Sequence, residues 1–258
     1  MKGIIFAGCS FTWGHGLYYY STMKNVVNQG DQFTPNLLTD AHIRYKNIFR
    51  FPRLVANHFN GFEIVREPNG GNDITSIDFV NDLFDKNKFN NGGKYDYSEI
   101  DYIILQTSQI VRNHFDVEVG GKLEKLSCGQ NNSKLIKFLI ENNLTYNEWF
   151  NIFTQQVFQK IKDFVIFYEN KGIKTKIWCW QDDLLKYIKL DSYFSDKFIT
   201  FEYEGQTYDC LDYMINLNEN LLISNDKINF TELIPDQHPS KLCHEIIAKN
   251  IIKNIENK

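Results

Sequence analysis

Long hydrophobic runs are missing from this chain of 258 residues. No stretch approaches the ~20 consecutive apolar residues that a membrane-spanning helix requires. The apolar run among the first ten residues is too short for the core of a signal peptide. The pattern therefore predicts a cytoplasmic protein that has no membrane partner.

Cysteine is scarce and irregularly placed. A disulfide framework needs an even set of paired cysteines, and a cysteine zinc site needs closely spaced ones. This chain has five, none of them in a Cys-x-x-Cys pair: Cys9, Cys128, Cys179, Cys210 and Cys243. The spacing favours neither kind of site and predicts reduced, buried thiols.

An excess of positive charge is also missing. The 28 Lys and Arg residues are outnumbered by 32 Asp and Glu residues, and no basic run is interleaved with aromatic residues. Binding to phosphates needs a concentrated basic surface, so the composition argues against a nucleic-acid partner. The hydrophobic fraction of 43% is typical of a globular chain that can bury a sizeable core.

Short apolar runs alternate with amphipathic segments along the whole chain. Continuous apolar runs that stop at glycine or turn residues are typical of buried parallel strands. Strands are predicted at 3–7, 62–66, 100–105 and 174–180, and helices from 52, at 74–85, at 147–170 and after 240. The alternation predicts one α/β domain over 1–258, a three-layer sandwich whose central parallel sheet is covered by helices on both faces.

Three segments do not follow this alternation. Residues 17–45 have no clean period and are expected to form an irregular excursion over the surface. Residues 116–145 are expected to be an insertion with a helical piece at 133–142, and 184–230 to hold short strands near 198–203. Such loops shape the substrate specificity of an enzyme more than its scaffold does.

A serine and a histidine at opposite ends of the chain could carry catalysis. Ser10 follows the first predicted strand, and His238 opens the last predicted helix. A serine hydroxyl needs a base that takes its proton, and a carboxylate such as Asp236 can orient that base. Asp236 and His238 can share one side of an extended segment because they are two residues apart. The pair Gly70-Gly71 would let backbone N–H groups approach a substrate oxygen.

Taken in order, these motifs resemble the SGNH/GDSL hydrolase family. The segment 8–11 (Gly-Cys-Ser-Phe) resembles the family's nucleophile block, with Cys9 in place of the usual Asp. The segment 69–72 (Asn-Gly-Gly-Asn) is similar to the second block, and 236–240 (Asp-Gln-His-Pro-Ser) to the terminal block. The resemblance extends from residue 3 to about residue 255. It implies the flavodoxin-like SGNH fold, with Ser10, His238 and Asp236 as catalytic residues.

The same resemblance implies an oxyanion hole. Its backbone donors would be Ser10 and Gly71, with Gly70 as the alternative to Gly71. The family's third block, Gly-x-Asn-Asp, is replaced here by Gln-Thr-Ser-Gln at 106–109. Thr107 and Ser108 are therefore the candidate third donors, with Arg112 as a further alternative and no asparagine until Asn113.

The terminal block differs in spacing from the family pattern. Its acid and base are separated by one residue instead of two, which makes Asp182 or Asp183 an alternative acid behind His238. His244 is expected to be a helix-surface or packing residue. A metal site built from Asp236, His238 and His244 is disfavoured because the His-x-x-x-His spacing is missing.

The resemblance implies a serine esterase that hydrolyses an acyl ester, a class that includes O-acetylated carbohydrates. The expected partner is a small-molecule or carbohydrate ester, with no cofactor and no metal ion. Two alternatives stay open: an O-acyltransferase with the same site, and a non-catalytic binding protein with the SGNH fold. The sequence predicts no oligomeric state.

Overall fold

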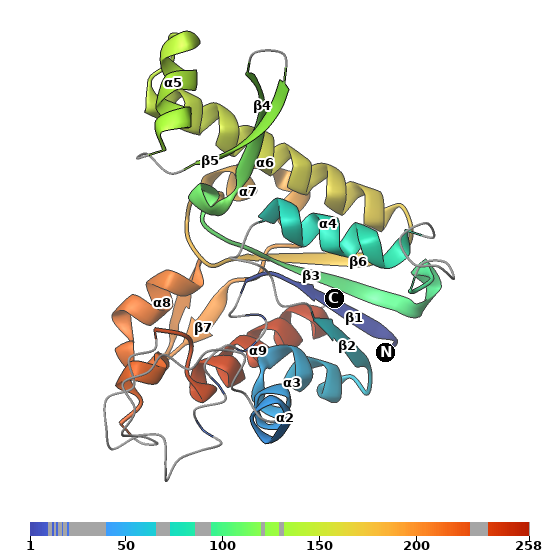
Figure 1. Cartoon of the computed structure of the whole chain (residues 1–258). Coiled ribbons are helices and arrows are strands. Elements are labelled where there is room, and N and C mark those ends of the chain that lie inside the picture. Colours follow the sequence, from blue (N-terminus) through green and yellow to red (C-terminus); the bar gives the residue numbers. More distant parts are fainter. Residues whose placement is uncertain are drawn as a thin grey trace.

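A parallel sheet in the order β2-β1-β3-β6 forms the centre of the computed structural model (Figure 1). The residues described are 1–9, 12, 14, 17, 20, 40–65, 73–85, 94–119, 122–128, 132–227 and 237–257. The strands of the sheet are β1 (Gly3–Ala7), β2 (Phe62–Val65), β3 (Ile100–Thr107) and β6 (Lys174–Cys179). All their pairings are parallel, as the sequence predicts.

Both faces of the sheet are buried. In β1, Ile4 and Phe6 point into one hydrophobic core, and Ile5 and Ala7 point into the other. Successive side chains of a strand point to opposite faces, so a strand covered on both sides must be apolar at every position. This requirement explains the continuous apolar run that marks β1 in the sequence.

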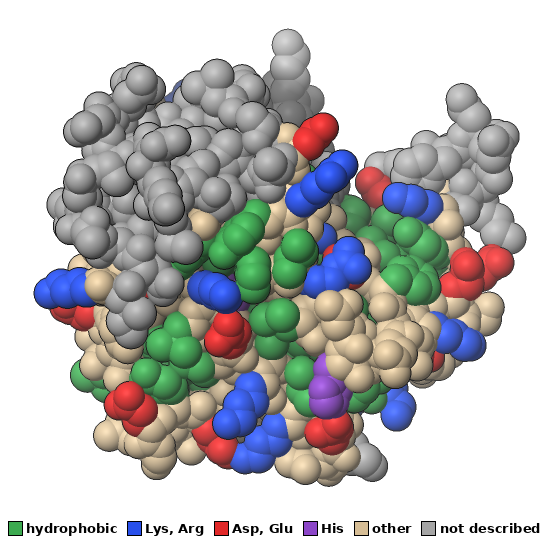
Figure 2. Space-filling view, turned by 90° about the horizontal axis from the view of Figure 1, so that it is seen from below, with side chains coloured by type: hydrophobic (Ala, Val, Ile, Leu, Met, Phe, Trp, Pro, Cys, Tyr) green, Lys and Arg blue, Asp and Glu red, His purple; other side chains and the backbone are tan. Residues whose placement is uncertain are grey.

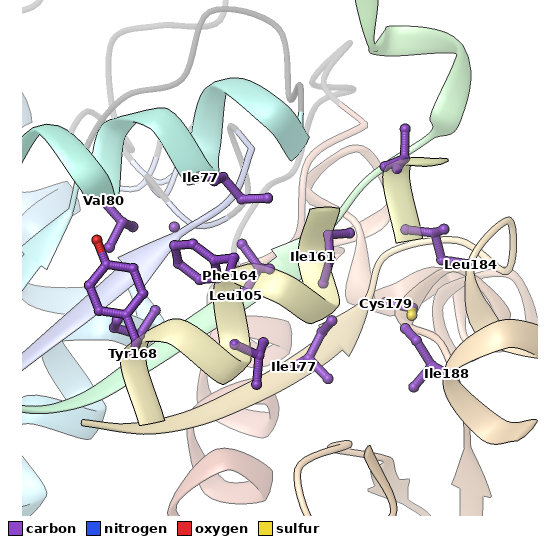
Figure 3. Packing of buried hydrophobic residues seen from close by; sticks show 14 of the residues in the cluster. Ile77, Val80, Leu105, Ile161, Phe164, Tyr168, Ile177, Cys179, Leu184 and Ile188 are labelled. Carbon is purple, nitrogen blue, oxygen red and sulfur yellow. The ribbon is translucent and has the colours of Figure 1, made fainter. Parts of the chain in front are cut away.

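Helices cover the two faces and make the three-layer sandwich that the sequence predicts (Figure 1). One face carries α4 (Asp73–Phe84) and α6 (Tyr146–Glu169), whose apolar side chains pack against β3 and β6 (Figure 3). The other face carries α3 (Phe51–His58) and α9 (Lys241–Glu256), with α2 (Asp40–Phe49) beside them.

Local capping fixes where two of these helices begin. Thr145 and Glu148 form a reciprocal capping box at the start of α6. The Ser240 side chain accepts a hydrogen bond from the backbone of Cys243 and so caps α9. Because α9 begins directly after residues 237–240, this cap also fixes the direction in which the His238 segment enters the helix.

The predicted insertion contains a hairpin and a helix. The elements are β4 (His114–Val119), β5 (Lys122–Ser127) and α5 (Ser133–Glu141). The helix at 133–142 is thus confirmed, and the Asn132 side chain caps it. The antiparallel hairpin was not predicted, because its charged residues alternate with apolar ones and the segment reads as polar overall.

The expected surface excursion at 17–45 is wrong in two respects. Leu17 and Tyr20 are buried and pack with Ile223, so these two residues do not lie on the surface. The helix α2 begins at Asp40, inside the stretch expected to be irregular. The other residues between 17 and 40 lie outside the described part of the chain.

The segment 184–230 consists of short elements. The predicted strand near 198–203 is confirmed by β7, although the strand is shorter than expected. Its helices and strands are α7 (Leu185–Leu190), β7 (Phe201–Tyr203), β8 (Gln206–Tyr208) and α8 (Leu211–Leu217). The segment also has three single turns of 3-10 helix: η5 (Ser192–Phe194), η6 (Glu219–Leu221) and η7 (Ile223–Asn225). Two further turns of this kind, η3 (Tyr97–Glu99) and η4 (Ile110–Arg112), lie before and after β3.

The surface of the molecule is mixed in character. On the face seen in Figure 2, basic and acidic side chains are interspersed, and hydrophobic side chains form small groups between them. Within the described ranges, no helix is both long enough and apolar enough to cross a bilayer.

Candidate functional site

The order of the strands places a topological switch point between the carboxyl ends of β1 and β3. The chain leaves β1 to form β2 on one side, and later returns to form β3 on the other side. In an open parallel sheet, ligands bind at such a switch point, outside the carboxyl ends of the strands. Cys9 follows β1 here, and Ser108 follows β3. Ser10 itself lies outside the described residues and is the next residue after Cys9 in the sequence.

Gln106 braces the loop that follows β1. Its side-chain oxygen accepts hydrogen bonds from the Cys9 backbone N–H at 3.3 Å and from the Thr12 hydroxyl at 2.5 Å. Its amide nitrogen donates to Cys9 Sγ at 2.8 Å. Gly8 leaves room for this arrangement, because a Cβ there would lie 2.3 Å from Thr12 Oγ1 and 2.6 Å from Gln106 Oε1. The backbone that leads into Ser10 is therefore held by the end of β3.

Two buried hydroxyl groups lie at the same edge. Thr107 and Ser108, the predicted third oxyanion donors, are 0% and 2% exposed. Among the described residues, neither hydroxyl oxygen has a hydrogen-bond partner of good geometry, although the Thr107 hydroxyl lies next to the Cys179 thiol. A buried polar group without a partner destabilises a fold by roughly 1–3 kcal/mol. Such groups are expected where a ligand supplies the missing partner.

A buried carboxylate that the sequence analysis missed lies beside these hydroxyls. Asp73, the first residue of α4, is 1% exposed. Its Oδ1 accepts a hydrogen bond from the Ser108 backbone N–H at 2.7 Å, and its Oδ2 accepts one from Asn113 Nδ2 at 3.2 Å. The Asn113 side-chain oxygen accepts in turn from the Ile74 backbone N–H at 3.2 Å. Asn113 therefore binds α4 instead of pointing an amide at a substrate.

Burial sets the charge of this carboxylate. It raises the pKa of Asp73 to about 7, and the nearby Asp183 carboxylate adds to the rise. The hydrogen bonds from Ser108 and Asn113 and the positive charge of Arg112 oppose the shift, because they favour the ionised form. Asp73 can therefore exchange a proton near neutral pH.

The alternative catalytic residues have other partners. Asp183 Oδ2 accepts a hydrogen bond from the Ile110 backbone N–H at 2.8 Å, and burial raises its pKa. Asp182 accepts a hydrogen bond from the Tyr213 hydroxyl. Arg112, the further candidate oxyanion donor, donates to Gln109 Oε1 at 3.0 Å. The predicted acid Asp236 and the predicted backbone donor Gly71, with its alternative Gly70, lie outside the described residues.

The segment that carries His238 lies against the loop that follows Ser10. The His238 carbonyl accepts a hydrogen bond from the Ile223 backbone N–H at 3.0 Å, and Ile223 packs with Leu17 and Tyr20. The Tyr20 hydroxyl accepts from the Lys241 backbone N–H at 3.2 Å and donates to Asp226 Oδ2 at 2.6 Å. Two segments more than 200 residues apart in sequence thus meet at this edge.

Two roles were predicted for His244: the packing role is confirmed, and the helix-surface role is wrong. It is 0% exposed, its ring stacks on Phe51, and its Nδ1 accepts the Phe51 backbone N–H at 3.3 Å. Burial lowers the pKa of His244 to about 3, with smaller contributions from His238 and Arg50. Within the described ranges, no three His, Cys, Asp or Glu side chains gather as metal ligands would.

A groove of about 420 Å³ lies next to this cluster. Its lining includes Ile74 and His114, the sequence neighbours of Asp73 and Asn113. Four aromatic side chains from β4, α5 and α6 line another part of it, with aliphatic, charged and polar side chains between them: Phe115, Phe138, Trp149 and Phe153. A second groove of about 660 Å³ shares Ile74 and continues between α4 and α6. Volumes of this size are typical of small-molecule sites.

Comparison of the chain with models of protein families, with curated proteins and with solved structures gave no match. The resemblance to SGNH/GDSL hydrolases stays a prediction from short motifs. The function therefore has to be argued from the chemistry of this site.

Proposed function

We propose that this protein is a serine esterase that hydrolyses an acyl ester, with Ser10 as nucleophile and His238 as general base. One observation carries the proposal. The chain that follows Ser10 contacts the His238 segment through Leu17 and Tyr20, and the Ser108 hydroxyl at the carboxyl edge of the sheet is buried with no partner among the described residues. This contact between distant parts of the sequence supports a site shared by Ser10 and His238.

The reaction would proceed in two balanced steps. Ser10 Oγ attacks the carbonyl carbon of the ester and forms a C–O bond, while its proton passes to His238. The tetrahedral oxyanion would accept hydrogen bonds from the Ser10 and Gly71 backbone N–H groups and from the Thr107 or Ser108 hydroxyl. The ester C–O bond then breaks, and the alcohol leaves with the proton held by His238. Water repeats the sequence on the acyl-serine and releases the acid.

Asp236 is the proposed acid of the site. It would accept a hydrogen bond from the His238 ring, fix its tautomer and stabilise the imidazolium that forms. Asp182 and Asp183 are weaker candidates, because each already accepts a hydrogen bond from another group.

The grooves beside the site support a small-molecule or carbohydrate ester as the substrate. Aromatic walls bind apolar acyl groups and the flat faces of sugar rings. The same site would act as an O-acyltransferase if a sugar hydroxyl took the place of water in the second step. The described cysteines are all buried and free, which supports the reducing cytoplasm as the location we propose.

The test is hydrolysis of p-nitrophenyl acetate by Ser10→Ala and His238→Ala. Each variant should lose activity by about 10⁴-fold, because each removes a group that takes part in bond making. Ser98→Ala and His58→Ala are matched controls, since both residues are exposed and distant from the site, and they should keep the wild-type rate. Circular dichroism checks that all four variants are folded. Wild-type activity in Ser10→Ala would reject the proposal.

A further inference from the structure

Asp73 takes part in more hydrogen bonds to distant residues than the start of a helix requires. The first backbone N–H groups of a helix need acceptors, and an exposed Ser or Asp usually supplies one. Here the acceptor for the Ile74 N–H is Asn113, a residue 39 positions away, and Asn113 also donates to the Asp73 carboxylate. Asp73 is left to bind the Ser108 backbone, 35 positions away, at 2.7 Å.

These contacts join two loops that the proposed reaction uses. Asp73 follows Gly71 by two residues in the sequence, and Ser108 is the first residue after β3. Asn113 is also bound to the preceding turn η4, because its Nδ2 donates a hydrogen bond to the Ile110 carbonyl at 3.3 Å. The beginning of α4 and the end of β3 are therefore fixed relative to each other by hydrogen bonds between buried side chains and backbone.

We propose that Asp73 and Asn113 form a clamp that sets the separation between the start of α4 and Ser108, and so positions the Ser108 hydroxyl as an oxyanion donor. Asp73 is a positioning residue in this scheme, because it acts through Ser108 and the start of α4. The inference rests on the proposed esterase function, since only an oxyanion hole gives that separation a catalytic meaning. An error of about 1 Å in the placement of such donors lowers turnover by as much as about 100-fold.

The clamp depends on the ionised carboxylate. An ionised Asp73 accepts from both N–H donors, whereas a neutral carboxyl group carries a proton that faces one of them. Protonation therefore removes one of the two bonds. The titratable and charged groups described around Asp73 are Asp183 after β6, Arg112 in η4 and the Cys179 thiol of β6. Burial dominates among these influences and brings the pKa of Asp73 to about 7.

Ionisation of Asp73 has opposite effects on the stability of the fold and on the clamp. The pKa of Asp73 is higher in the folded state, about 7, than the ordinary value of 3.8. The folded state therefore binds the proton more tightly, and the free energy of unfolding falls as pH rises from about 4 to about 7. Ionisation tightens the clamp while it destabilises the fold as a whole. A merely structural aspartate at a helix start would have the reverse dependence on pH.

The experiment compares Asp73→Asn with Asp82→Asn, a partly exposed aspartate on the same helix that lines neither groove, in the full chain. In Asp73→Asn, kcat for p-nitrophenyl acetate should fall by about 10- to 100-fold with KM changed less than about threefold. The slope of log kcat against pH on the acid side should decrease from about two to about one, because one of two titrating groups is gone. Asp82→Asn should match the wild type in all three values.

Two further measurements keep the inference open to refutation. Asn113→Ala should reproduce the loss of kcat, and the Tm of Asp73→Asn relative to wild type should increase between pH 4 and pH 7. An unchanged kcat and acid slope in Asp73→Asn, in an otherwise active wild type, would overturn the clamp alone. A wild type that neither hydrolyses the ester nor reacts with a serine-directed phosphonate would overturn the esterase function and the clamp with it.

Discussion

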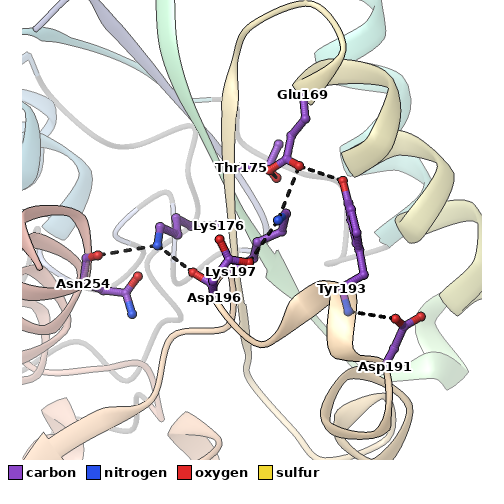
Figure 4. A network of polar contacts seen from close by, with 8 residues as sticks. All are labelled: Glu169, Thr175, Lys176, Asp191, Tyr193, Asp196, Lys197 and Asn254. Atoms are coloured by element: carbon purple, nitrogen blue, oxygen red, sulfur yellow. Dashed lines mark hydrogen bonds and ion pairs between the residues drawn. The ribbon is translucent and has the colours of Figure 1, made fainter. Parts of the chain in front are cut away.

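The two ends of the sheet differ in the partners that surround a partly or fully buried carboxylate. At the amino end of β6, Glu169 accepts hydrogen bonds from the Thr175 hydroxyl at 2.9 Å and the Tyr193 hydroxyl at 2.7 Å (Figure 4). Lys197 Nζ adds an ion pair at 3.4 Å. The negative charge at this end has a positive partner and two hydroxyl donors.

At the carboxyl end, Asp73 has only neutral hydrogen-bond donors among the described residues, and it is almost fully buried. The neighbouring Ser108 hydroxyl is buried and has no hydrogen-bond partner among the described residues. Folded proteins usually satisfy buried polar groups, and they break this rule mainly at functional sites. In the proposed esterase, the amino end of β6 serves stability and the carboxyl end serves chemistry.

Among the substitutions that distinguish the two ends of the sheet, Ser108→Ala is expected to have the largest effect, a loss of kcat. The hydroxyl has no described partner to lose, so the free energy of unfolding should stay within about 0.5 kcal/mol of wild type. If the hydroxyl is the third oxyanion donor, kcat should fall by about 100-fold. Thr107→Val provides the comparison for the other candidate donor. Equal wild-type rates in both variants would remove this pair from the site.

A smaller effect of the opposite kind is expected from Glu169→Gln. The change removes the charge that Lys197 and two hydroxyl groups bind, so thermal unfolding should shift down by about 2–8 °C. Ester hydrolysis should stay at the wild-type rate, because this network lies at the end of β6 away from the site. Loss of activity in a folded Glu169→Gln protein would contradict the division between the two ends.

The smallest expected effect concerns acid lability. Burial lowers the pKa of His244 from 6.5 to about 3, so the unfolded state binds more protons between these values. The free energy of unfolding should therefore fall as pH decreases from 6.5 toward 3. His244→Asn keeps an acceptor for the Phe51 N–H and should show a flatter dependence in urea titrations at pH 4 to 7. An unchanged slope would show that another group controls acid unfolding.

The fold could be predicted from the sequence because its signals are local. The central strands β1 and β3 contain continuous apolar runs, since helices cover both faces of the sheet, and each long helix has aliphatic or aromatic positions at helical spacing. The parallel arrangement followed from the alternation of these two patterns. The hairpin β4–β5 was missed because only one of its faces needs apolar residues, and α2 because its sequence lacks a strong apolar face.

The candidate site was only partly accessible from sequence. The positions of Thr107 and Ser108 at the end of β3 followed from where the apolar run stops. Asp73 and Asn113 could not be paired in advance, because their contact depends on how α4 and η4 meet in three dimensions. A signal did exist: an Asp directly after Gly-Gly-Asn at the start of a predicted helix, where a carboxylate finds backbone donors. The place of His244 in the last helix left a surface and a packing role open, and only the packed structure distinguishes them.

The most direct test of the central claim is covalent labelling of Ser10. A fluorophosphonate reacts with an activated serine, forming an O–P bond and releasing fluoride, and tryptic mass spectrometry identifies the modified peptide. We predict one adduct on the peptide that contains Ser10, its absence in Ser10→Ala, and slow labelling in His238→Ala. Labelling of wild type and Ser10→Ala to the same extent, or no adduct on folded wild type, would contradict the assignment of this edge of the sheet as a serine hydrolase site.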